Sequence, residues 1–205
     1  MTHGKKTQLV ESLQTNVTDF FNKFIAKHAK HMKCAAGCAN CCRVNLSVFP
    51  VEAQLILSWW KALSVSERQQ ISMRWRVDEL STSDSESALP KCFFLSENKC
   101  SIYPVRPVVC RTQGLPLKVT EIPPAQPQES GQFELSLCEL NFEKEMSLPS
   151  PAEWLDLERL NTLLSLAQQH TPEEDLSPEI LILAQRHLGR VPLSELGLLL
   201  LHNAE

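Results

Sequence analysis

The chain has 205 residues, of which 43% are hydrophobic and 21% charged; this is enough apolar material for one ordinary core or two small ones and excludes a wholly disordered chain. Its 24 acidic and 20 basic residues give a net charge of −4, so the basic surface of a nucleic-acid-binding protein is not expected. No apolar run approaches the roughly 18 to 20 residues that cross a bilayer, which predicts a protein without a membrane span.

Three helices are expected in the first part of the chain. Apolar side chains recur at steps of three and four over residues 8–32, which predicts a helix that ends near the first cysteine. Pro50 favours the first turn of a second helix, which runs to about Leu63. Ser64 and Glu67 fit a capping box at the start of a third helix.

Loops and short strands are expected in the middle of the chain. The small polar residues 81–90 and the proline-rich residues 121–131 are typical of loops or connectors. The segment 92–103 has no helical period and is expected to form a folded loop with a short hairpin. Apolar and polar residues alternate over 133–137, which predicts a short strand.

Helices are expected again in the leucine-rich last quarter. Residues 150–153 form a capping signal for a helix through about Gln168. Ser177 with Pro178 predicts a helix that Gly189 ends, and residues 193–202 predict a last short one.

The expected fold class is mainly α: a small helical protein with cysteine-rich metal-binding loops and at most a short β-hairpin or strand pair. The simplest division is a cysteine-cluster metal-binding domain over residues 1–145 and a leucine-rich helical C-terminal segment over 146–205 packed on it. Lys5 and Lys6 precede an amphipathic segment without a cleavage site, so no secretory signal is expected and the cytosol is the predicted compartment.

Cysteine is the informative residue type. A reducing cytosol keeps thiols reduced, so eight cysteines favour metal ligation over disulfides. The predicted metal ligands are Cys34, Cys38, Cys41, Cys42, Cys92, Cys100, Cys110 and Cys138. The first four lie within nine positions, and such short spacings let one loop present two thiolates to one ion.

The adjacent pair Cys41 and Cys42 is geometrically constrained. Their α-carbons lie about 3.8 Å apart, which is below the usual disulfide range. Adjacent side chains also diverge, so the two sulfurs are expected to serve different ions or different corners of one cluster.

Cations and a helix start surround the later cysteines. Cys110 follows Pro107 in a predicted first helical turn, which favours a thiolate with a lowered pKa. Arg106 and Arg111 flank it. We expect these arginines to support an anionic metal site from outside the ring of ligands, which is favoured over binding of an anionic substrate.

His28 and His31 share a helical face with Cys34 at steps of three. They could bind a metal ion together with cysteines, but the surrounding lysines favour solvated side chains.

The segments GCANCCR and KCFFLSENKCSIYPVRPVVCR resemble the bacterial cysteine-cluster proteins of the YkgJ type, the CxxCxxCC domain described as zinc- or iron-chelating and sometimes labelled an Fe-S oxidoreductase. The second cysteine motif of that family matches these residues: Cys92, Phe94, Leu95, Cys100 to Tyr103, Arg106, Pro107, Cys110 and Arg111. Three residues separate Cys34 from Cys38, where the family name implies two. The resemblance covers about residues 30–140 and implies a metal site, without fixing a reaction.

Three functions follow as hypotheses. The first is metal binding with zinc as first choice, because two all-sulfur tetrahedral sites would use all eight cysteines and the metal would be mainly structural. The second is a redox or electron-transfer protein with iron or an iron–sulfur cluster, which leaves open whether the protein is an enzyme, because no catalytic group is identified. The third is a metal-stabilised module whose C-terminal helices dock a protein partner.

Overall fold

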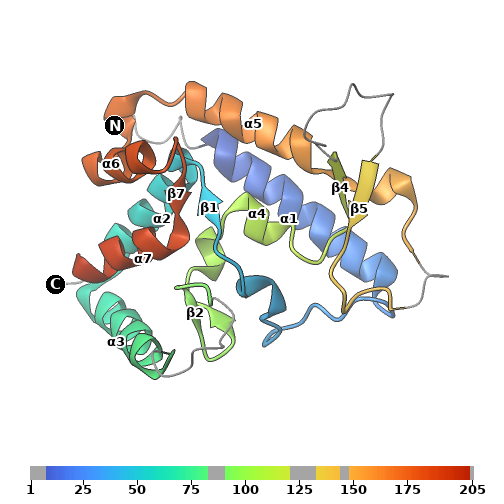
Figure 1. Ribbon diagram of the computed structural model, residues 1–205, viewed down its shortest axis with the longest axis horizontal. Coiled ribbons are helices and arrows are strands. Elements are labelled where there is room, and N and C mark those ends of the chain that lie inside the picture. The colour runs from blue at the N-terminus through green and yellow to red at the C-terminus, as the bar shows by residue number, and fades with distance from the viewer. Residues whose placement is uncertain (1–7, 83–90, 121–132, 144–147, 204–205) are drawn as a thin grey trace.

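The computed structural model describes residues 8–82, 91–120, 133–143 and 148–203. The described chain is mainly helical with small sheets, which confirms the expected class (Figure 1). Its α-helices are α1 (Gln8–His28), α2 (Pro50–Ala62), α3 (Val65–Thr82), α4 (Val108–Arg111), α5 (Leu157–Gln169), α6 (Pro178–Arg186) and α7 (Leu193–His202). Its strands are β1 (Ser47–Val48), β2 (Leu95–Ser96), β3 (Lys99–Cys100), β4 (Leu117–Thr120), β5 (Phe133–Ser136), β6 (Leu155–Asp156) and β7 (Val191–Pro192). None of the helices in these ranges combines the length and apolar character needed to cross a membrane.

Local capping signals place several helix ends as expected. The backbone amide of Ser64 donates to Glu67 Oε2 at 2.8 Å and the amide of Glu67 donates to Ser64 Oγ at 3.3 Å, which confirms the capping box before α3. Helix α2 begins at Pro50 and α7 spans the predicted residues. Helix α1 ends at His28, earlier than predicted. Residues 29–31 form a turn, and the His31 carbonyl there accepts a hydrogen bond from the amide of Phe142 at 2.9 Å.

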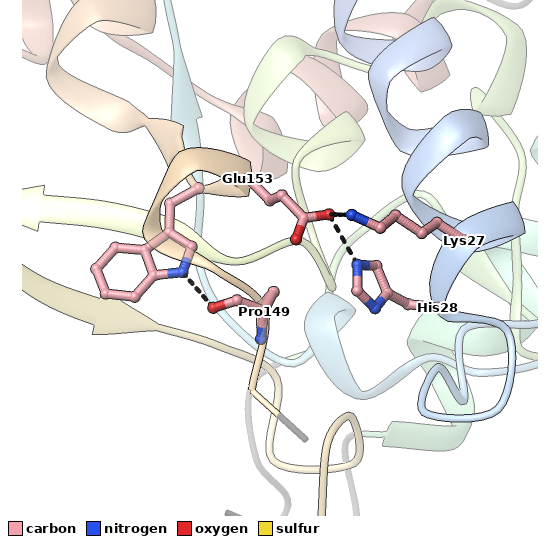
Figure 2. A network of polar contacts seen from close by, with 5 residues as sticks. Lys27, His28, Pro149 and Glu153 are labelled. Carbon is pink, nitrogen blue, oxygen red and sulfur yellow. Dashed lines mark hydrogen bonds and ion pairs between the residues drawn. The ribbon is translucent and has the colours of Figure 1, made fainter. Parts of the chain in front are cut away.

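The predicted start of a helix near residue 150 is wrong. Residues Pro151–Glu153 form a single 3-10 turn and α5 begins at Leu157, where Asp156 Oδ1 accepts from the amide of Arg159 at 3.0 Å. Residues 155 and 156 instead pair with β4 as strand β6. Glu153 does not cap this turn, because its carboxylate binds two side chains of α1 (Figure 2).

The predicted hairpin and strand are confirmed. Strands β2 and β3 pair antiparallel with Leu95 opposite Cys100, and the turn between them holds Glu97 and Asn98 at φ 49° and 57°. Strand β5 lies where alternation predicts it and pairs antiparallel with β4, while β6 pairs parallel with β4 on its other edge. Most of the expected loop 81–90 and the connector 121–131 lie outside the described residues; Ser81 and Thr82 belong to α3.

The largest core joins the cysteine segments to the end of the chain. Strand β1 pairs with β7, so a segment near residue 47 is bound to one near residue 192. Ile180 of α6 and Leu196 of α7 are fully buried in the cluster that holds Trp60 and Phe94. A β-carbon on Gly197 of α7 would meet the ring of Phe93, which shows how closely α7 approaches the residue after Cys92.

Candidate metal centre

Two chain segments that carry cysteines are fastened directly to each other. Residues Asn40–Cys42 form a 3-10 turn, and the Cys42 carbonyl accepts a 2.8 Å hydrogen bond from the amide of Cys92. Cys100 lies on β3 and Cys110 on α4, next to the same hydrophobic cluster. The fold therefore gathers cysteines from three parts of the chain around the Asn40–Cys42 turn.

Four thiols form what we call the inner thiol group: Cys42, Cys92, Cys100 and Cys110. In every pair of these thiols, the charge on one side chain affects the pKa of the other. The group is partly buried, and all eight cysteines of the chain are free thiols.

A second set, the outer thiol group, consists of Cys34, Cys38 and Cys138. The charges of Cys38, Cys138 and Cys41 each act to raise the pKa of Cys34. Cys41 also neighbours Cys92, Cys100 and Cys110, so it lies between the two groups.

The adjacent thiols do not diverge as the sequence suggests. Cys41 and Cys42 hydrogen-bond through their side chains, which is possible because the short 3-10 turn holds them next to each other. This bond raises the pKa of Cys41 far above the ordinary thiol value, and it lowers the pKa of Cys42. Cys42 is therefore the thiol of the pair that ionises first.

Burial governs the remaining inner thiols. It raises the pKa of Cys100 to about 11 and also raises the pKa of Cys92 and Cys110. The expected lowering at Cys110 is wrong, because the four-residue helix α4 offers little dipole and neighbouring thiols add to the desolvation cost. A bound cation would supply the charge that these thiolates lack, since thiolate rather than thiol is the metal ligand.

The two flanking arginines have different surroundings. The Arg106 guanidinium lies 4.0 Å from the Tyr103 ring centroid, and its charge acts to lower the pKa of Cys41 and Cys100. Arg111 donates to the carbonyls of Arg106 (2.8 Å) and Pro104 (2.9 Å) and to the Thr18 hydroxyl (2.9 Å). Arg106 thus acts on Cys41 and Cys100, whereas Arg111 ties α4 to α1 and interacts electrostatically with Cys110.

Asn141 organises the outer group, and sequence reasoning missed it. Its side chain is buried; Oδ1 accepts from the amide of Lys33 at 2.8 Å, and Nδ2 donates to the Gly114 carbonyl at 2.9 Å and to Cys34 Sγ at 3.4 Å. Its own amide donates to the Cys138 carbonyl at 2.9 Å.

Glu52 is a second residue that the sequence did not reveal. It is 2% exposed, and its two carboxylate oxygens accept from the amides of Phe49 (3.2 Å) and Val108 (2.9 Å). These amides lie at the starts of α2 and α4, so the carboxylate joins the two helix N-termini. Burial raises the pKa of Glu52, and the two hydrogen bonds oppose that shift. Glu52 thereby fixes the helix that carries Cys110.

The two histidines near Cys34 are packed rather than solvated. The His28 Nε2 is 2.9 Å from Glu153 Oε1 (Figure 2). The His28 ring lies 4.5 Å from that of Phe24, and the His31 ring stacks on Phe142 at 5.5 Å. The reading of these side chains as solvated is therefore wrong. In the described ranges, no set of three or more histidine, cysteine or acidic side chains has the arrangement of a metal site.

Comparison with known families bears on this site. Residues 33–131 match the family model CxxCxxCC, described as "Putative zinc- or iron-chelating domain". The match confirms the resemblance seen in the cysteine motifs and includes every predicted ligand except Cys138. The comparisons with curated proteins and with solved structures give no match.

Proposed function

Because residues 33–131 match the CxxCxxCC family model, we propose that the protein binds two metal ions through its eight cysteine thiolates, with zinc as the first candidate. The metal is structural in this proposal. Binding free energy then becomes folding free energy, since thiolates separated along the chain are brought together by the ion. The single observation that carries the proposal is the mutual proximity of the four inner thiols.

The inner thiol group supports one four-sulfur site. Cys42, Cys92, Cys100 and Cys110 come from three separate segments, and four thiolates match the tetrahedral preference of zinc. A zinc ion with four thiolates carries a net charge of −2, and the Arg106 guanidinium is positioned to offset part of it.

The outer thiol group supports a second site when Cys41 joins it. Cys34 has Cys38, Cys41 and Cys138 as its thiol neighbours, which gives a second set of four. Cys41 and Cys42, whose side chains interact with each other, then serve different ions across one peptide bond. The Asn141 amide, which already donates to Cys34 Sγ, would stabilise a thiolate at this position.

An iron–sulfur cluster is the second candidate, and the apolar surroundings of the inner group favour it. Cys92, Cys100 and Cys110 pack against the main hydrophobic cluster, which would shield a cluster from water and set its potential. The protein would then serve redox or electron transfer. Protein purified without oxygen is coloured if iron and sulfide are bound and colourless if zinc is bound.

Docking of a protein partner through the C-terminal helices remains the third hypothesis. Buried Ile180, Leu196 and Leu200 commit the inner faces of α6 and α7 to the core, so a partner would meet only their outer faces. The reducing cytosol, where thiols stay available as metal ligands, remains the proposed site of action.

Native mass spectrometry of the anaerobically purified full chain tests the proposal. We expect two ions per chain in the natural protein. The double variants Cys34→Ser/Cys138→Ser and Cys100→Ser/Cys110→Ser should each retain one ion. A natural protein without metal would overturn metal binding, and loss of both ions from each folded double variant would overturn the assignment of two separate sites.

A further inference from the structure

The two thiol groups differ in how open they are to another molecule. Of the eight cysteines, all of which lie in the described ranges, only Cys38 of the outer group is exposed, and the others are partly buried. The residues just before it, Ala35, Ala36 and Gly37, are exposed as well. The outer thiol group therefore has one member on a part of the surface that other molecules can reach.

Small side chains precede this exposed cysteine. Ala35 and Ala36 end at a methyl group, and a β-carbon built on Gly37 would meet nothing within 4 Å. The Cys38 amide donates to the Ala35 carbonyl at 3.0 Å, so residues 35–38 form one compact turn. Figure 1 shows the chain between α1 and β1 along the lower edge of the molecule, below α1 and α4. The backbone of a second polypeptide can thus come close to Cys38 without meeting a bulky side chain of the turn.

The inner thiol group has the opposite surroundings. Cys92, Cys100 and Cys110 pack against the main hydrophobic cluster. Cys100 is also paired across the hairpin with Leu95, which is buried. A ligand that replaces all of these sulfurs must therefore disturb the main core, and core elements open far less often than exposed turns.

We propose that the outer thiol group is a transfer site, which passes its ion to cysteine pairs of another polypeptide, whereas the inner thiol group keeps its ion. The inference rests on the proposed function, because it requires an ion in each group. It gives the outer ion a role beyond the structural one.

Transfer of zinc is an exchange of sulfur ligands. Four bonds from the ion to the outer sulfurs break, namely those of Cys34, Cys38, Cys41 and Cys138, and four bonds to incoming sulfurs form. The four incoming thiols lose their protons as the four outer thiolates gain them, since only thiolates are ligands. No electron is transferred.

Three compounds test the transfer. The anaerobically purified full-length protein is mixed with an excess of a synthetic peptide in which two residues separate two cysteines, with its analogue in which both cysteines are serine, and with glutathione, a small single thiol. Native mass spectrometry follows the ions that the protein retains. We expect the dithiol peptide to remove one ion at least about tenfold faster than the other. Glutathione should remove that ion more slowly, and the serine peptide should remove none.

The outcomes separate this inference from the proposed function. A protein that holds no ion would overturn the proposed function and the transfer site with it. Two ions that leave at one rate, or that both stay bound, would overturn the transfer site alone. Removal by glutathione as fast as by the dithiol peptide would overturn the assignment of a polypeptide as the acceptor.

The variant Cys34→Ser/Cys138→Ser identifies the group that releases its ion. It lacks two outer ligands, so the fast phase should disappear and its remaining ion should leave at the slow rate of the natural protein. Fast removal of that remaining ion would show that the inner thiol group is the one that exchanges, and would overturn the proposal.

The variant Ala36→Trp tests the approach at the turn. A bulky side chain two residues before Cys38 should slow transfer to the dithiol peptide severalfold, while two ions are still bound before mixing. Ala62→Trp, the same change at an exposed position at the end of α2, should leave the rate unchanged. Equal transfer rates in the two variants would contradict entry of the acceptor at residues 35–38.

Discussion

Gly114 and the sulfur of Cys34 are packed so closely that a β-carbon on Gly114 would stand 2.4 Å from that sulfur. Gly114 also holds φ at +88°, and its carbonyl accepts the hydrogen bond of Asn141, which contacts Cys34 as well. Absence of a side chain at residue 114 is therefore part of how the outer thiol group is positioned.

The first prediction concerns Gly114→Ala. The new methyl group must displace Cys34, so we expect the metal content to fall from two ions toward one per chain, as measured by elemental analysis. Gly189→Ala is the matched control, because Gly189 has φ +82° with open space around its Cα. Both variants carry a similar backbone cost of about 1–2 kcal/mol, so only the contact with sulfur differs. Equal metal content in the two variants would refute this role of Gly114.

Glu52→Gln tests the carboxylate that joins α2 and α4. Both oxygens of Glu52 accept backbone N–H groups, and a glutamine would turn an NH₂ group toward one of them. We expect the free energy of unfolding in urea to fall by about 1–3 kcal/mol. Glu158→Gln, at an exposed position of α5, should leave it nearly unchanged. A Glu52→Gln protein as stable as the natural one would show that the two hydrogen bonds do not matter.

Acid should weaken the contact between α1 and the Pro151–Glu153 turn. Hydrogen bonds from Lys27 and His28 lower the pKa of Glu153 to about 2 (Figure 2). A carboxyl group whose pKa is lower in the folded state stabilises the fold above its unfolded pKa, near pH 4.5, and this contribution disappears as the pH falls toward 2. In Glu153→Gln, the loss of stability over this interval should be smaller than in Glu174→Gln, as followed by circular dichroism. Identical acid curves would contradict the prediction.

Truncation after residue 148 should unfold the chain. The missing segment contains β7, which pairs with β1, and the buried residues Ile180 and Leu196 of the main core. We therefore expect the fragment 1–148 to show no cooperative thermal transition. A folded, metal-loaded fragment would contradict this and would favour the hypothesis that the C-terminal helices serve a partner.

Local signals in the sequence were sufficient for much of the helical framework. The capping box at Ser64 and the proline at position 50 act within one helical turn, so they could be recognised without a structure. The capping signal at residues 150–153 failed because residues 155 and 156 pair with strand β4 and because Glu153 binds Lys27 of α1. Pairing over such distances leaves no local pattern.

The same reasoning applies to the candidate site. Cysteine spacing identified the thiols, because ligand residue types are conspicuous in a sequence. It could not identify Asn141, whose partners Lys33 and Cys34 are more than a hundred residues away, nor Glu52, whose partner Val108 is 56 residues away. The lowered pKa expected for Cys110 was wrong because burial, which a sequence does not display, outweighs a short helix.

X-ray absorption at the edge of the bound metal tests convergence of the thiols most directly. For the anaerobically purified full chain, we predict about four sulfur atoms per metal at about 2.3 Å and no nitrogen or oxygen in that shell. A shell dominated by nitrogen or oxygen would contradict ligation by the cysteines.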